Sequence, residues 1–260
     1  MLNLIKYEFI RKYKLIAVTI ITAIALNIFL ITRGVGGSAT FLVLFPIVLF
    51  VLYLTDIIKM YSDDLNNKTG YMLFMTPNSG YKIISSKLLT AVLEGFALLF
   101  LYFIFTLING AYIVVSTGAQ IDYSQIIRVV DNLLSGSLGF SLSHIFISLT
   151  AALAFFLAFI TTVYTAMTIR KSIFSEIKFG GLLSFIIFLC INWGISVISS
   201  RLFDIITPYY DSITNAILSA GRATPEELAL ILLPMTAFSI IQAIALTGIS
   251  GYLLEKKINL

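Results

Sequence analysis

Six long runs of apolar residues limit what this chain can fold into. They cover approximately residues 15–31, 40–58, 88–115, 141–168, 179–198 and 228–254. A helix needs roughly 17–25 apolar residues to cross the ~30 Å hydrocarbon core of a bilayer. Only 12% of the 260 residues are charged, about half the share found in soluble domains. The pattern predicts an all-α integral membrane protein, with residues 1–260 forming a single transmembrane domain of six helices.

The basic residues are distributed unevenly among the segments outside these runs. Of the 17 Lys and Arg residues, all but four fall in the N-terminal segment, the second and fourth connectors and the C-terminal tail; the exceptions are Arg33, Arg128, Arg201 and Arg222. Lys and Arg accumulate on the cytoplasmic side of membrane proteins. We therefore expect both termini in the cytoplasm. The positive-inside rule also accounts for the formal net charge of +4, so the charge gives no support to nucleic-acid binding.

Three further segments are predicted to be helical without spanning the bilayer. Residues 2–14 place apolar side chains on one stripe, with the basic residues Lys6, Arg11, Lys12 and Lys14 turned elsewhere, which is typical of an interfacial amphipathic helix. Residues 123–134 predict a second such helix on the outer side. Residues 199–227 are partly apolar and predict short helices that enter the outer leaflet. The stripe in the N-terminal segment consists of Leu2, Ile5, Phe9 and Tyr13.

The connector between the second and third runs contains a short apolar segment, Tyr71–Met75, among polar residues. Five apolar side chains facing water are unfavourable unless another protein covers them. Pro77 follows and is expected to end a short helix, because proline disfavours helical conformation in the preceding residue. We interpret this segment as a cytoplasmic docking element, with Asp64 on its exposed flank. A polar loop that covers its own apolar side chains is the alternative.

Two acidic residues fall within the predicted spans and form a possible intramembrane polar site. Asp56 lies near the inner end of the second span, where a snorkelling or docking role is as plausible as a site. Glu94 lies about two turns from Lys87, and seven residues separate the two by about 10 Å along a helix, which makes pairing awkward. Glu94 is therefore expected either in a cavity open to the cytosol or as the partner of another helix.

The sequence contains no recognisable catalytic or metal-binding pattern. One cysteine, Cys190, and one histidine, His144, are too few for a zinc site. Ser250 lies in a Gly-x-Ser-Gly pattern, but it and His144 are expected at opposite faces of the membrane, too far apart for nucleophile and base. A phosphate-binding loop requires a glycine directly before its Lys-Thr or Lys-Ser pair, and this chain has one pair of each kind, neither of which is preceded by glycine. We expect no catalytic residues, no metal and no cofactor in this chain.

The stretch Gly70–Gly80 (GYMLFMTPNSG), followed by Ile83–Ile84 and Ser86–Leu89, resembles the signature of ABC-2 type permease subunits of bacterial ATP-binding-cassette transporters. The opening residues Leu2–Phe9 resemble the N-terminal elbow helix of that family. Six spans, cytoplasmic termini and an outer segment between spans five and six also match. Within the family, the chain is similar to phenol-soluble modulin exporters and to lantibiotic or bacitracin-type resistance transporters.

The resemblance implies a transport subunit of the bacterial cell membrane that is not itself an enzyme. Two ABC ATPase subunits would bind ATP and Mg²⁺, and a second permease copy or a paralogue would complete the transporter. The substrate would be apolar or amphipathic, and a membrane-active peptide is the best guess. A coupling helix would dock on the ATPase, and the residues expected to transmit this coupling are Asp63, Asp64, Lys68, Tyr71, Met72, Leu73, Phe74, Met75 and Pro77.

Two other functions are compatible with six spans. An ion-coupled secondary transporter predicts internal repeats, broken helices at the midplane and buried acid pairs, and none of these is evident in the sequence. A stand-alone immunity or scaffold protein is the other alternative. Co-purification with an ATPase would separate the permease from both. The sequence names neither the substrate nor the direction of transport, and does not decide between homodimer and heterodimer.

Overall fold

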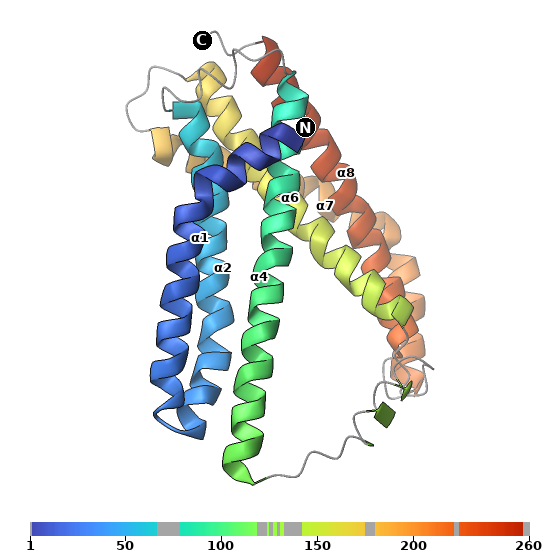
Figure 1. The fold of residues 1–260 in the computed structure, drawn as a ribbon. Helices are drawn as coiled ribbons and strands as arrows, with labels where there is room; N and C mark the ends of the chain where they lie inside the picture. The colour runs from blue at the N-terminus through green and yellow to red at the C-terminus, as the bar shows by residue number, and fades with distance from the viewer. Residues whose placement is uncertain are drawn as a thin grey trace. The chain divides into compact units, whose positions relative to one another are not determined.

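The computed structural model describes residues 2–66, 79–118, 124, 127–128, 131–132, 142–174, 180–220 and 224–256. These residues form six long helices (Figure 1), which are α1 (Leu2–Ile31), α2 (Val35–Asn66), α4 (Gly80–Thr117), α6 (Leu142–Ile173), α7 (Gly180–Ala220) and α8 (Pro225–Lys256). Each contains a stretch long and apolar enough to cross a membrane. The prediction of an all-helical protein with six apolar helices is confirmed.

The described residues divide into two compact units. The first contains α1, α2 and most of α4, and the second contains α6, α7 and α8 together with Ser79–Tyr81. In the first unit, α1 ends at a tight turn in which Gly34 has a φ of +84°. Glycine adopts this left-handed conformation without steric cost, which is why it so often follows a helix.

One half of the first unit is held by aromatic packing around a buried amide. Phe45 stacks on Phe41, with ring centroids 4.6 Å apart, and meets the edge of Phe105 at 5.1 Å. Asn109 is fully buried and donates to Asn27 Oδ1 at 2.9 Å. Its own Oδ1 accepts from the Ser38 hydroxyl at 2.6 Å. Because a buried amide is stable only when it is hydrogen-bonded, this triad fixes the register of α1, α2 and α4.

In the second unit, α6 packs closely against α8 through small side chains. Thr165 shares a 2.8 Å hydrogen bond with Ser250, and Gln242 donates to Thr162 at 3.1 Å. Small residues let membrane helices approach each other, and hydroxyl groups bond across the interface. Ser250 is therefore a packing residue of this interface. The buried small residues of α6 are Ala151, Ala154, Ala158, Thr161, Thr162 and Thr165.

Helix α8 begins where its sequence dictates. The Thr224 side chain accepts from the Glu227 amide at 3.3 Å, and Glu227 Oε2 accepts from the Thr224 amide at 2.8 Å. This is a reciprocal capping box, with Pro225 at the first helical position, where its missing N–H is harmless. The cap starts the helix three residues before the predicted span at residue 228.

The prediction of short helices within residues 199–227 is wrong, because α7 is continuous for 41 residues. At 1.5 Å per residue it is about 60 Å long, twice the hydrocarbon thickness. Pro208 lies inside it. The tyrosines that follow, Tyr209 and Tyr210, donate to backbone carbonyls of α8 at 3.2 Å each. Packing on α8 stabilises the continuous helix here, where the sequence predicted short separate helices.

The expected elbow at residues 2–14 differs as well. These residues are not a separate helix but the first part of α1, which runs unbroken from Leu2 to Ile31. Figure 1 shows this N-terminal part at an angle to the rest of the helix. The side chains it buries are Ile5, Glu8 and Lys12, whereas Leu2 and Tyr13 are exposed. The sequence predicts Lys12 on the side of a surface helix away from the apolar stripe, but the structure buries it, as it buries Ile5 of that stripe.

Candidate functional site

A network of buried charges joins the three helices of the first unit. Within the described residues, six ion pairs connect three cations to four carboxylates. A charge inside an apolar helix is costly unless it is paired, because the membrane interior cannot solvate it. The members, which we call the charge network, are Glu8, Arg11 and Lys12 of α1, Asp56 and Asp64 of α2, and Lys87 and Glu94 of α4.

The first half of the network is centred on Lys87, which is only 1% exposed. Its ammonium group contacts Glu8 Oε1 at 2.8 Å and also pairs with Asp64. Arg11 closes the ring, since its guanidinium reaches Glu8 at 2.8 Å and Asp64 at 2.6 Å. Two cations therefore face two carboxylates, and this half is electrically balanced when all four groups are ionised.

The second half is centred on Lys12, which is 5% exposed. Its Nζ contacts Glu94 Oε2 at 2.7 Å and also pairs with Asp56. One cation here serves two carboxylates. When all three groups are ionised, this half carries one excess negative charge.

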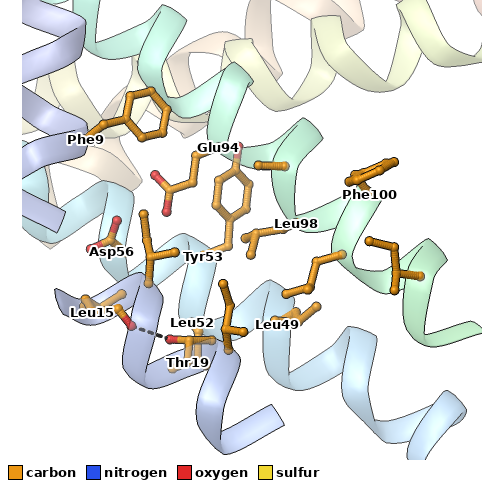
Figure 2. A pocket seen from close by; sticks show the side chains of 15 residues that line it. Phe9, Leu15, Thr19, Leu49, Leu52, Tyr53, Asp56, Glu94, Leu98 and Phe100 are labelled. Atoms are coloured by element: carbon orange, nitrogen blue, oxygen red, sulfur yellow. Dashed lines mark hydrogen bonds between the residues drawn. The ribbon is translucent and has the colours of Figure 1, made fainter. Parts of the chain in front are cut away.

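A cavity of about 190 Å³ begins at this second half. Figure 2 shows the carboxylates of Asp56 and Glu94 at one end of it, close to Phe9. The wall beyond them is almost entirely apolar and is supplied by all three helices. Its apolar residues include Leu15 and Ile20 of α1, Leu49 and Leu52 of α2, and Leu98 and Ile104 of α4.

Tyr53 shapes the wall beside the carboxylates. Its hydroxyl donates to the Ala91 carbonyl at 2.5 Å, which crosslinks α2 to α4. Gly95 makes this approach possible, since a Cβ there would lie 2.6 Å from the tyrosine oxygen. A non-bonded carbon cannot come that close to an oxygen, so any larger residue at position 95 would displace Tyr53 and open the cavity wall.

The structure brings together only some of the residues predicted as a site. Asp56 and Glu94 meet at Lys12, so both are partners of another helix, and both also line the cavity. The prediction for Asp64 is wrong, because this residue is 4% exposed and ion-paired rather than on an exposed flank. Asp63, next to it in α2, is partly exposed. Lys68, Tyr71, Met72, Leu73, Phe74, Met75 and Pro77 lie outside the described residues.

The basic members of the network were missed. Taken singly, Arg11, Lys12 and Lys87 fit the positive-inside rule, and Glu8 fits the elbow helix that residues 2–9 resemble. One signal was available, because the first three helices carry opposite charges at depths that match when α1 and α4 run antiparallel to α2. Pairing of basic and acidic residues across spans is the usual arrangement of charges in a membrane.

Comparisons with known proteins return no similarity. No family model matches the chain, and no curated protein or solved structure is similar to it. The length and apolar character of the helices are therefore the basis for assigning a class to this protein. Six apolar helices of spanning length are the architecture of a multi-pass membrane protein.

Proposed function

We propose that this chain is the membrane-spanning permease subunit of an ATP-driven ABC exporter in a bacterial cell membrane. Separate ATPase subunits would bind ATP and Mg²⁺, and a second permease copy or a paralogue would complete the pore. The substrate would be apolar or amphipathic, with a membrane-active peptide as the best candidate. The proposed family rests on the motif Gly70–Gly80, which resembles the ABC-2 signature.

The observation that best supports coupling is the position of the charge network. Asp64 lies three residues before the connector 67–78, and Lys87 lies nine residues after it. The two are ion-paired to each other, and both are paired to α1 through Glu8 or Arg11. The helices on both sides of the connector are therefore clamped to each other and to α1.

Ion pairs at this place would transmit movement of the connector to both of its helices. If Tyr71–Met75 docks on an ATPase, movement of the ATPase would displace α2 and α4 at the same time. Buried ion pairs resist separation, because parting them leaves an uncompensated charge. The three helices of the first unit would then move together as a rigid body, which is how alternating access is usually driven.

The test is co-purification of the ATPase with permease variants at equal membrane expression. Phe74→Ala should cost about 2–4 kcal/mol of association, as loss of an aromatic hot spot does. Asp63→Asn, a change at a partly exposed charge beside the connector, should cost roughly 0–1 kcal/mol. Full retention of the ATPase by Phe74→Ala would show that this segment is not the docking element.

The acid pair gives an ion-coupled secondary transporter some support as a second candidate. Buried acid pairs are expected of such transporters, and Asp56 and Glu94 share Lys12 inside the first unit. In proteoliposomes that contain this chain without an ATPase, an imposed proton or sodium gradient would drive substrate movement if this candidate holds. Transport that needs ATP and an ATPase would favour the exporter.

A further inference from the structure

The cavity beside Lys12 combines an apolar wall with a few polar groups, which is the usual form of a ligand pocket. One end carries two carboxylates, and the rest of the wall is apolar. We infer that this cavity binds a cationic amphiphile, with an ammonium group at Asp56 and Glu94 and a short alkyl or aromatic group against the apolar wall. The inference rests on the proposed function and deepens it, because it names the chemistry of the substrate that the permease would recognise.

Charge balance leaves room for one cation. The half of the network around Lys87 pairs two cations with two carboxylates, so it requires no further charge. The half around Lys12 has one cation for two carboxylates. Both carboxylate side chains are about nine-tenths buried, where an uncompensated charge is strongly unfavourable. Either a proton or the ammonium group of a ligand would restore balance at the only part of the network that borders the cavity, as far as the described residues show, and a cationic ligand would bind here in place of the proton.

The carboxylates are also able to accept another donor. Lys12 Nζ contacts Oδ2 of Asp56 and Oε2 of Glu94, one oxygen of each group. An ionised carboxylate offers about four lone-pair sites on its two oxygens. An ammonium group has three donors, so a ligand can bind both carboxylates without displacing Lys12.

The size of the cavity sets the apolar part of the ligand. An engineered protein cavity of about 150 Å³ holds a benzene molecule, and this one is about 190 Å³. It therefore has room for a group slightly larger than benzene, such as a six-carbon chain or an aromatic ring. The cavity is partly open, so a longer chain would extend beyond it. The lysine side chain or the amino terminus of an amphipathic peptide, together with an adjacent apolar side chain, would fit.

The probe that matches these features is hexylammonium. Equilibrium dialysis against the purified full-length chain in phosphatidylcholine nanodiscs, with empty nanodiscs subtracted, should show saturable binding at one site. Hexanol, which keeps the chain and lacks the charge, should bind about tenfold more weakly or worse, since its hydroxyl brings no positive charge to the carboxylates. Methylammonium, which lacks the chain, should bind at least about tenfold more weakly as well.

Two variants test the two parts of the cavity separately. Glu94→Gln removes the excess charge and leaves Lys12 paired with Asp56, and should weaken hexylammonium binding by about tenfold or more. Ala97→Phe fills the apolar part and leaves every charge in place. Ala97 lines the cavity and is exposed there, so the larger side chain displaces no buried neighbour. If Glu94→Gln fails to fold, Ala97→Phe decides alone.

Equal binding of hexylammonium and hexanol would overturn the inference, because it would mean that the carboxylates are already neutralised, for example by a proton. Undiminished binding to Ala97→Phe would also overturn it. Neither measurement involves an ATPase. If hexylammonium does not bind but the ATPase still co-purifies, the ligand site is refuted and the exporter function stands. If hexylammonium binds but no ATPase co-purifies, the ligand site stands and the exporter function is refuted.

Discussion

Replacing Lys87 by glutamine should destabilise the unit formed by α1, α2 and α4 by about 3–5 kcal/mol. Lys87 Nζ lies 2.8 Å from Glu8 Oε1, and at an effective dielectric constant of about 20 this pair is worth roughly 6 kcal/mol of Coulomb attraction. Its second partner, Asp64, adds to this. Desolvation of the buried charges offsets part of the attraction, which brings the expected loss to the range measured when one partner of a buried pair is removed.

The measurement is the free energy of unfolding of the full-length chain in a fixed detergent, by titration with a denaturing detergent. Lys59→Gln is the matched control, because Lys59 is an exposed lysine of α2, and its loss should change the free energy by less than about 0.5 kcal/mol. The double variant Glu8→Gln/Lys87→Gln leaves Arg11 with Asp64 and restores charge balance. Its loss of stability should be smaller than the sum of the losses of the two single variants, by an interaction energy of about 0.5–3 kcal/mol.

Equal stability of Lys87→Gln and Lys59→Gln would contradict the role of Lys87 in the charge network. A double variant whose loss equals the sum of the two single losses would contradict it as well, because it would show that Glu8 and Lys87 do not interact. Either result would mean that Lys87 is solvated or neutral in the folded protein.

Three further outcomes are expected. Asn109→Leu should cost about 1–3 kcal/mol in the same unfolding assay, because it leaves Asn27 and Ser38 buried without their shared partner; a smaller loss than that of Lys59→Gln would contradict the register-fixing role. On a background with Cys190→Ser, an impermeant thiol reagent should label Ser124→Cys from outside the cell and should not label Asn66→Cys, and the reverse pattern would invert the topology. The purified chain alone should hydrolyse no ATP, which a phosphate-release assay checks; turnover that survives removal of contaminants would contradict the assignment of ATPase activity to a partner.

Much of the fold was predictable from local sequence. The six helices follow from apolar runs whose only stable form in a bilayer is helical, since every backbone group must be hydrogen-bonded within the segment. The start of α8 at Thr224-Pro225 could also have been read from its capping box. Residues 199–227 were less predictable: their partly apolar sequence suggests short helices, yet Tyr209 and Tyr210 bond to α8 and α7 is continuous. Contacts with a neighbouring helix can outweigh the intrinsic helix propensity of a segment.

The candidate site was only half predictable. Asp56 and Glu94 stood out because acidic residues are rare inside spans. Their partner did not, since Lys12 is separated from them by 44 and 82 residues in the chain. In sequence, a lysine near the end of a span looks the same whether it snorkels to the lipid head groups or enters the protein. The burial of Asp64 was hidden for the same reason.

By itself, the sequence determined the class of this protein. Whether a segment can span a bilayer depends on the length and apolar composition of that segment, and both are given by the sequence. Tertiary structure decided which charges are neutralised and which are not. Pairing depends on the distance between atoms of different helices, and three cations and four carboxylates reach one another only when α1, α2 and α4 pack together. The unbalanced half of the network and the cavity beside it exist only in that packed unit.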